Sequence, residues 1–321
     1  MPGPSELFAH LDVGRPVVVQ AHDFPDHDAV ASAFAVYVLM SDAGYVAHLC
    51  YGGQIQSNSL HDAIEALGIP IASCSELRLR EKPQLIVVDG FAGNSNVAGF
   101  DADLVGTIDH HPPPYTPTHG YVDIRDTYGS CSTILYDYLR EAAIEIDGRL
   151  ATALLMGLMM DTAFMTRGVS EADLDAFDRL FRVGDWRLAT RLLKNSLSLS
   201  DLATFRQAID ACVVEQDFAF VSLQGAITAE VMALIADFLM GLREIEFVVV
   251  VSGDRDEHRI SVRSEDQNRP CDVIIHAALR GIGSGGGHMH MGGGSVPIDL
   301  YPGDEGLRRR FLQAQGTPFD E

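Results

Sequence analysis

Residues 22–29 read His-Asp-Phe-Pro-Asp-His-Asp-Ala and lie between the β-branched run 17–19 and the long apolar stretch 29–40. This order predicts a buried strand, a tight loop and a helix. The loop holds two carboxylates two residues apart, with an imidazole four residues upstream of the first. Divalent cations take such oxygen and nitrogen ligands, and open α/β sheets place their sites at the carboxyl ends of strands. We interpret this loop as half of a metal centre.

The composition limits the class of protein. The chain has 321 residues, of which 47% are hydrophobic and 21% charged, so a folded protein with room for two domains is expected. The net charge of −22 opposes contact with long polyphosphate backbones and argues against a protein that tracks DNA or RNA. A small anionic substrate stays compatible with this charge, because bound cations reverse the local field.

Cysteine usage and the apolar runs indicate the compartment. The five cysteines are odd in number and include no Cys-x-x-Cys pair, which favours buried thiols in a reducing compartment over disulfides or a zinc site. No signal peptide is evident, and the longest apolar runs are too short to span a bilayer. We therefore expect a cytoplasmic protein without a membrane partner.

Alternating strand and helix patterns predict an α/β fold with a parallel sheet and crossover helices. Strands are expected over residues 17–21, 45–51, 85–89 and 104–108. Helices are expected over residues 4–11, 29–40, 60–67, 130–144, 150–164 and 171–182.

The pattern then restarts after a predicted connector helix over residues 187–202. Strands follow over residues 218–223, 246–251 and 259–263, and helices over residues 229–240 and 272–279. We therefore divide the chain into a first domain over residues 1–185, a linker helix over residues 186–205 and a smaller α/β domain over residues 206–321.

Side chains that bind divalent cations occur at four places: His22, Asp26 and Asp28; Asp89; Asp109, His110 and His111; and Asp161. The first three places follow predicted strands, so in a parallel sheet they meet at one edge. The fourth lies in a predicted apolar helix, where a carboxylate is costly to bury unless it is paired or binds a metal.

The charges of this set match two divalent cations. Four carboxylates, those of Asp26, Asp28, Asp89 and Asp161, would repel one another and raise each other's pKa without metal. Two cations about 3.5–4 Å apart form the clamp that is used in phosphoester hydrolysis. Simpler alternatives stay open, since an Asp after a strand is often a helix N-cap and residues 109–111 could be a polar loop.

A second candidate site lies in residues 283–288, Gly-Ser-Gly-Gly-Gly-His, where we expect no regular element. Glycine lets the backbone approach a ligand and offer N–H groups to an anion. His288 could donate to a phosphate or stack on a base, and Arg263 is a candidate bidentate phosphate ligand. The alternative is a flexible loop with incidental histidines.

Together these motifs resemble those of a known family. His22-x-x-Pro25-Asp26-x-Asp28-Ala29, Asp89 after an apolar strand, Asp109-His110-His111 and Asp161-Thr162 are similar to the four motifs of the DHH phosphoesterases. Gly285-Gly286-Gly287-His288 with Gly292-Gly293 resembles the glycine signature of the associated DHHA1 domain. The resemblance implies an N-terminal DHH domain with a mostly parallel sheet flanked by helices, followed by a smaller α/β DHHA1 domain.

The resemblance also implies roles for single residues. One cation, typically Mn²⁺, would be held by His22, Asp26 and Asp89. The other would be held by Asp28, Asp89, His110 and Asp161. Asp109 would orient a histidine, and His111 would contact the scissile phosphate or protonate the leaving oxygen. The substrate would be held in the C-terminal domain by Arg263, Gly286, Gly287 and His288.

The branch that this arrangement resembles includes nano-RNA phosphodiesterases, 3′-phosphoadenosine-5′-phosphate phosphatases and dinucleotide hydrolases. It implies a hydrolase that binds nucleotides and nucleic acid, cleaves short oligonucleotides or 3′-phosphonucleotides as an exonuclease would, and uses two cations, with Mg²⁺ or Co²⁺ as alternatives to Mn²⁺. The apolar content permits a homodimer. A non-catalytic nucleotide sensor and a polyphosphate or pyrophosphate hydrolase are the alternatives.

Two positions depart from the family pattern. Phe24 stands where Asn is usual, and His27 stands where Gly is usual between the two Asp residues. His27 adds bulk and the option of a charge beside the predicted cations, so we expect the substrate choice to differ from that of the type enzymes.

Overall fold

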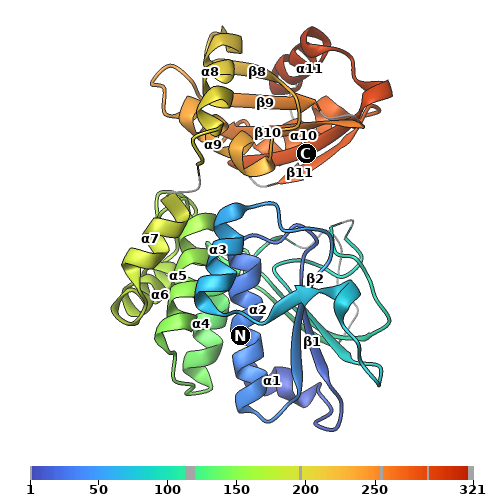
Figure 1. Cartoon of the computed structure of the whole chain (residues 1–321), viewed down its shortest axis with the longest axis vertical. Helices are drawn as coiled ribbons and strands as arrows, with labels where there is room; N and C mark the ends of the chain where they lie inside the picture. The colour runs from blue at the N-terminus through green and yellow to red at the C-terminus, as the bar shows by residue number, and fades with distance from the viewer. Residues whose placement is uncertain are drawn as a thin grey trace. The chain divides into compact units, whose positions relative to one another are not determined.

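A computed structural model describes residues 2–94, 96–112, 120–194, 197–253, 256–287 and 289–316. The chain divides into two compact units, Met1–Ser196 and Leu197–Glu321, each with its own sheet (Figure 1). Among the described residues, none of the helices has the length and apolar character needed to cross a bilayer. The predicted α/β fold is confirmed.

The sheet of the N-terminal unit is parallel throughout, in the order β3-β2-β1-β4-β5-β6. Its strands are β1 (Val17–Ala21), β2 (Ala47–Tyr51), β3 (Ile71–Ser73), β4 (Gln84–Val88), β5 (Asp103–Asp109) and β6 (Tyr121–Ile124). The chain runs outward from β1 to β3, then returns to β4 on the other side of β1. The carboxyl ends of β1 and β4 therefore flank the point where the strand order reverses, which is where such sheets bind ligands.

Helices cover one face of this sheet, on the side where α2 to α7 gather in Figure 1. The helices are α1 (Pro4–Ala9), α2 (His27–Asp42), α3 (Asn58–Leu67), α4 (Cys131–Glu141), α5 (Gly148–Asp161), α6 (Glu171–Val183) and α7 (Trp186–Lys194), with a 3₁₀ turn at Cys74–Glu76. Helix α2 is buried along most of its length because it packs against β1, α4 and α5.

Irregular segments cover the opposite face. Val18, Leu85 and Val87 point to this side and form a small apolar cluster with residues of the loops that follow β3 and β4. Successive side chains of β1 point to opposite faces of the sheet, and both faces are covered. All five residues of β1 are therefore buried, which explains the apolar run at residues 17–19.

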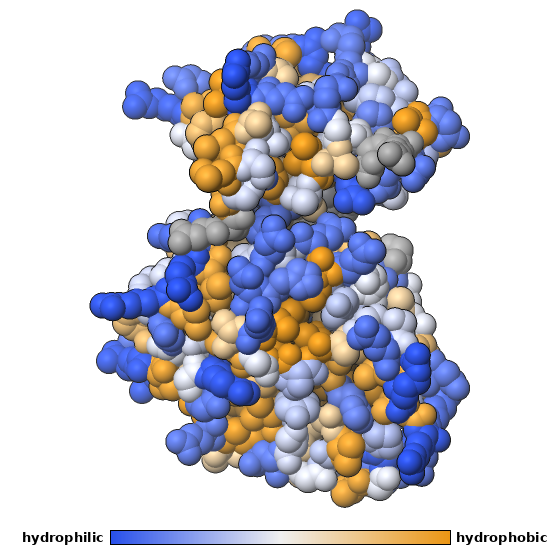
Figure 2. All heavy atoms as spheres, viewed as in Figure 1, coloured by the Kyte–Doolittle hydropathy of each residue, from blue (hydrophilic) through white to orange (hydrophobic). Residues whose placement is uncertain are grey.

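The C-terminal unit has a mixed sheet in the order β11-β12-β10-β9-β8-β7. Its strands are β7 (Val213–Glu215), β8 (Phe218–Gln224), β9 (Phe247–Gly253), β10 (Glu257–Ser264), β11 (Ser284–Gly287) and β12 (Met291–Pro297). Its helices are α8 (Asp201–Ala211), α9 (Ala229–Met240), α10 (Cys271–Leu279) and α11 (Asp304–Gly316), with a 3₁₀ turn at Ile298–Leu300. Figure 2 shows apolar atoms exposed over α8 and α9, where Leu202 and Phe238 contribute to the surface.

The glycine-rich stretch differs from expectation, because it contains two paired strands instead of an irregular loop. Strand β11 pairs antiparallel with β12, with Gly285 opposite Gly294. A Cβ atom on Gly285 would lie 2.9 Å from the side chain of Ile275, and one on Gly294 would lie 2.7 Å from that of Leu279. Glycine therefore lets α10 pack closely on this hairpin.

The predicted linker helix is also different. Helix α7 ends at Lys194, and α8 begins at Asp201 after a turn. The side chain of Asp201 accepts hydrogen bonds from the backbone N–H and the hydroxyl of Ser198, at 2.7 and 2.6 Å. These bonds favour a new helix start here, so two helices replace the single connector.

Candidate metal centre

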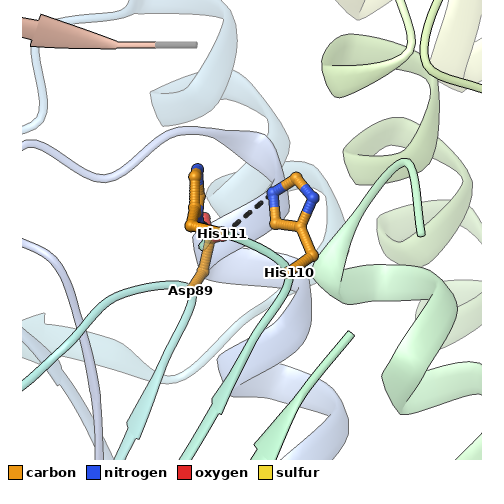
Figure 3. A group of neighbouring side chains, drawn as sticks. All are labelled: Asp89, His110 and His111. Carbon is orange, nitrogen blue, oxygen red and sulfur yellow. Dashed lines mark ion pairs between the residues drawn. The ribbon is translucent and has the colours of Figure 1, made fainter. Parts of the chain in front are cut away.

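The carboxyl ends of β4 and β5 bring three polar side chains together (Figure 3). Asp89 directly follows β4, and His110 and His111 directly follow β5. Asp89 Oδ1 lies 3.5 Å from His110 Nε2 and 3.6 Å from His111 Nδ1. Asp89 also has a φ of 53°, a left-handed backbone conformation that costs energy for a residue other than glycine. Such strain is often found where a side chain must point into a site.

Asp89 belongs to three groups whose ligand atoms lie within 4.8 Å of one another. The groups are His22, Asp26 and Asp89; Asp28, Asp89, His110 and Asp161; and Asp89, His110 and His111. The first two groups contain the same residues that the sequence motifs assigned to the two cations. The structure therefore brings all six predicted metal ligands into one cluster, and their binding of metal stays a prediction.

Asp26 has two roles in this arrangement. It is the N-cap of α2, and its Oδ1 accepts the backbone N–H groups of Asp28 and Ala29 at 2.9 and 3.0 Å. The simpler alternative, a helix cap, therefore holds for Asp26 without removing it from the cluster with His22. The cap fixes the carboxylate at the start of the helix that also carries Asp28.

Asp28 is fully buried and is held by the first turn of α4. Its two carboxylate oxygens accept the backbone N–H groups of Cys131 and Ser132 at 2.7 and 2.9 Å. Burial, together with the nearby charge of Asp161, raises the pKa of Asp28 to about 8. Without a cation, this carboxyl group therefore retains a proton at neutral pH for much of the time.

His110 lies between Asp89 and Asp161 in the cluster. Its Nδ1 donates to the carbonyl oxygen of Tyr128 at 3.2 Å, which turns Nε2 toward Asp161 Oδ2, 3.1 Å away. Burial lowers the pKa of His110, but Asp161 outweighs it and raises the pKa to about 10. In proteins, a backbone carbonyl on one ring nitrogen commonly prepares the other nitrogen to bind a metal.

The donor set fits divalent cations. Asp89 Oδ1 is buried and accepts no hydrogen bond from the described residues. Burial and the charge of Asp28 raise the pKa of Asp89 well above its ordinary value. Several carboxylates close together, with the imidazoles of His22 and His110 beside them, are costly to bury in a protein interior unless a cation neutralises their charge.

Residues 16–158 match the sequence model of the DHH family, N-terminal domain. Residues 16–158 belong to the DHH family. The match covers the strands and helices that carry Asp26, Asp28, Asp89 and the two histidines after β5. The predicted DHH membership is confirmed, and the predicted branch of the family stays a prediction.

Two curated relatives extend this result. The chain is 26% identical over 318 residues to an uncharacterized protein of Methanocaldococcus jannaschii, covering 95% of this chain and 65% of that protein. It is 27% identical over 153 residues to a Streptococcus pyogenes protein named "Probable manganese-dependent inorganic pyrophosphatase", covering 46% of this chain and 49% of that protein. The chain thus spans less than two thirds of the length of either relative.

Solved structures share the fold. An exopolyphosphatase-related protein from Bacteroides fragilis superposes with a TM-score of 0.76 at 17% identity, covering 97% of this chain and 94% of that chain. RecJ from Thermus thermophilus, in complex with Mn²⁺, superposes with a TM-score of 0.58 at 15% identity, covering 98% of this chain and 54% of that chain. At these identities the similarity shows the fold alone.

Asp109 and His111 form a fixed pair beside the cluster of candidate metal ligands. Asp109 is fully buried, and its Oδ1 accepts the backbone N–H of both His110 and His111, at 2.8 and 3.1 Å. The same oxygen lies 2.6 Å from His111 Nδ1. The histidine that Asp109 orients is therefore His111, and its partly exposed ring directs Nε2 away from Asp109.

The departure at His27 does not add a charge to the DHH cluster. His27 is buried, and its Nε2 lies 3.1 Å from the hydroxyl of Ser59. Burial lowers the pKa of His27 to about 4, so the ring is neutral at physiological pH. Phe24, the other departure, has 53% of its surface exposed. Of the two changes, only Phe24 presents its side chain to solvent.

The predicted substrate residues lie in the C-terminal unit. Arg263 is buried in β10, where Nε donates to Asp237 Oδ1 at 2.6 Å and Nη1 donates to the carbonyl oxygen of Val262 at 3.0 Å. Gly286 and Gly287 lie exposed in β11, and His288 lies outside the described residues. The binding of substrate by these residues stays a prediction.

Sequence reasoning missed one glycine that shapes the cluster. Gly157 lies in α5, one helical turn before Asp161. A Cβ atom at this position would lie 2.7 Å from Asp28 Oδ1 and would also meet the hydroxyl of Ser132. The signal in the sequence was a single glycine inside an apolar helix. Glycine lowers helix stability, so its presence there indicates a position where close packing leaves no room for a side chain.

Proposed function

We propose that the protein is a metal-dependent phosphohydrolase that cleaves phosphoester bonds in short nucleotides. The observation that carries this proposal is the set of overlapping ligand groups that share Asp89 at the switch point of the parallel sheet. Membership of residues 16–158 in the DHH family supports it, because the motifs in this segment resemble those of phosphoesterases.

The chain offers ligands for two divalent cations, and we propose Mn²⁺ as the preferred ion. One cation would be held by His22, Asp26 and Asp89, and the other by Asp28, Asp89, His110 and Asp161. When bound, such ions would act as Lewis acids that activate water and neutralise charge on phosphate oxygens. Mixed imidazole and carboxylate ligands suit Mn²⁺, and the name of the Streptococcus pyogenes relative includes manganese dependence.

His111 is the residue that we propose for proton transfer. Asp109 accepts a hydrogen bond from the Nδ1–H group of His111, which fixes the ring and leaves Nε2 to contact a phosphate oxygen or to protonate the leaving oxygen. His110 differs, because Tyr128 turns its Nε2 into the ligand cluster. Two adjacent histidines therefore take two different tasks.

We propose a short nucleotide as the substrate and the C-terminal unit as the part that holds it. Gly286 and Gly287 are exposed in β11, the edge strand of the sheet, and backbone N–H groups on such an edge suit an anion. The net charge of −22 disfavours a long polyanion and leaves a short one as the better candidate. Pyrophosphate or polyphosphate is the second candidate, because the Streptococcus pyogenes relative carries a pyrophosphatase name.

A substrate panel at fixed Mn²⁺ tests the proposal. Purified full-length protein is incubated with a linear dinucleotide, 3′-phosphoadenosine-5′-phosphate, a cyclic dinucleotide, pyrophosphate and polyphosphate, and the products are separated by chromatography. We expect mononucleotides from the dinucleotide, and no turnover by Asp89→Asn. Preferred release of phosphate from pyrophosphate would favour the second candidate. Tight nucleotide binding without any product would instead indicate a sensor.

A further inference from the structure

Asp173 is a fully buried carboxylate that belongs to none of the metal-ligand groups found in the described part of the chain. It lies in the first turn of α6, and its oxygens accept four hydrogen bonds. Two come from the backbone N–H and the hydroxyl of Ser170, at 2.7 and 2.6 Å; the N–H bond is half of the capping box of α6, and the hydroxyl bond joins the same two capping residues. The other two come from Gly129 N at 2.8 Å and Thr133 Oγ1 at 2.5 Å. Helix capping accounts for the first two bonds only.

Residues 128–132, which we call the bridging segment, explain why the other two bonds matter. The carbonyl oxygen of Tyr128, at one end, accepts from His110 Nδ1 at 3.2 Å. At the other end, the N–H groups of Cys131 and Ser132 hold the carboxylate of Asp28 at 2.7 and 2.9 Å. One short stretch of backbone therefore holds two members of the second predicted cation group.

Gly129, in the middle of the bridging segment, has no room for a side chain. A Cβ atom here would lie 2.7 Å from Thr162 Cγ2 and 2.9 Å from Asp173 Oδ2. Thr162 is the residue after Asp161, and its hydroxyl donates to the carbonyl oxygen of Leu158 at 2.6 Å. The segment is thus packed closely against both the carboxylate of Asp173 and the residue that follows Asp161, the third member of the group.

We infer that Asp173 is a positioning residue for the metal centre, acting through the bridging segment on Asp28 and His110. This inference rests on the proposed metal centre and deepens it. A carboxylate that accepts from Gly129 and Thr133 fixes the backbone N–H and C=O groups that aim the two ligands. Residues behind metal ligands commonly set metal affinity in this way.

Asp173→Asn in the full-length protein tests the inference. Asn keeps one acceptor oxygen of the carboxylate and replaces the other by an NH₂ group. This NH₂ group would face a hydrogen-bond donor, the N–H of Gly129 or the hydroxyl of Thr133, that now bonds to the carboxylate. We expect the dissociation constant for Mn²⁺, measured by electron paramagnetic resonance of the free ion, to rise about 10-fold or more. Ser170→Ala is the matched control, because it weakens the α6 cap but leaves Asp173 on Gly129 and Thr133. We expect Ser170→Ala to lower the melting temperature while keeping the affinity within about twofold of wild type, a change below 0.5 kcal/mol.

The outcomes separate the inference from the proposed function. A wild-type chain that does not bind Mn²⁺ contradicts the metal centre itself and removes the basis of the inference. If wild type binds Mn²⁺ and Asp173→Asn binds it with the same affinity, the inference alone is overturned. The inference is also overturned if Ser170→Ala loses as much Mn²⁺ affinity as Asp173→Asn does. If Asp173→Asn does not fold, Thr133→Val decides, since it removes one bond to Asp173. A weakened Mn²⁺ affinity supports the inference, and a wild-type affinity overturns it.

Discussion

His111 Nδ1 lies 2.6 Å from Oδ1 of Asp109, while the neighbouring His110 makes its own Nδ1 bond to the carbonyl oxygen of Tyr128. The two rings, 4.2 Å apart between centroids, are therefore fixed by different partners. One carboxylate thus holds the ring proposed for proton transfer, and one backbone carbonyl holds the ring proposed for metal binding. This difference predicts that substitutions at the two histidines have different effects.

His111→Ala should lower kcat by about 10²–10⁴, the usual contribution of a positioned proton donor. Mn²⁺ binding should stay close to wild type, because the second predicted cation group does not include His111. Steady-state kinetics on the preferred substrate and the Mn²⁺ dissociation constant check this together. His110→Ala is the comparison and should weaken Mn²⁺ binding. Equal losses of metal affinity in both variants would contradict the division of tasks.

Asp26→Asn should separate helix capping from metal binding. Asn caps helices about as well as Asp, so the melting temperature of the metal-free protein should change little. The loss of one negative charge from the group with His22 and Asp89 should reduce Mn²⁺ binding at one of the two predicted sites. Isothermal titration calorimetry should then give a lower stoichiometry or a weaker second step. An unchanged titration would restrict Asp26 to its role as the cap of α2.

Gly157→Ala should destabilise the protein by about 1–3 kcal/mol, because the added methyl group overpacks α5 against Asp28 and Ser132. The free energy of unfolding from urea denaturation measures this. Gly148→Ala in the same helix is the control. Its Cβ atom would meet only an ordinary contact, 3.6 Å from the carbonyl oxygen of Val183, so its stability should stay near wild type or rise. Similar stabilities for the two variants would argue against the close packing at Gly157.

Removal of metal should make stability depend on pH in a defined direction. In a chelator, Asp28 has its pKa raised to about 8 and His110 has its pKa raised to about 10. Both folded-state pKa values exceed those of the unfolded chain, about 4 for Asp and about 6.5 for His. The folded state therefore binds more protons on these two groups, so their contribution to stability is lost as the pH rises from about 4 to about 8 for Asp28 and from about 6.5 to about 10 for His110.

Bound Mn²⁺ should abolish this loss, because cations take the place of the protons on Asp28 and Asp89. Differential scanning calorimetry across this pH range, with chelator and with Mn²⁺, compares the two states. A melting temperature in chelator that rises with pH over the same range would contradict the pKa directions.

Part of the site could be predicted because its ligands follow apolar strands directly. Asp89 and the two histidines come immediately after β4 and β5, and parallel strands bring their carboxyl ends to one edge. The glycine-rich stretch could not be predicted as a hairpin, because Gly285 and Gly294 have no side chains to show the alternation of a strand. The pairing of β12 with β10 supplies what local sequence does not.

The sequence by itself determined the parallel sheet and the family and predicted the candidate ligand set, because these depend on side-chain chemistry and on apolar periodicity. Only the tertiary structure decided what holds the ligands in place. Backbone groups such as the Tyr128 carbonyl and the Ser132 N–H have no signature in sequence, and Asp173 could be recognised there only as part of a helix cap. Their effect on Asp28 and His110 arises from the packing of α4, α5 and α6, which joins residues that are far apart along the chain.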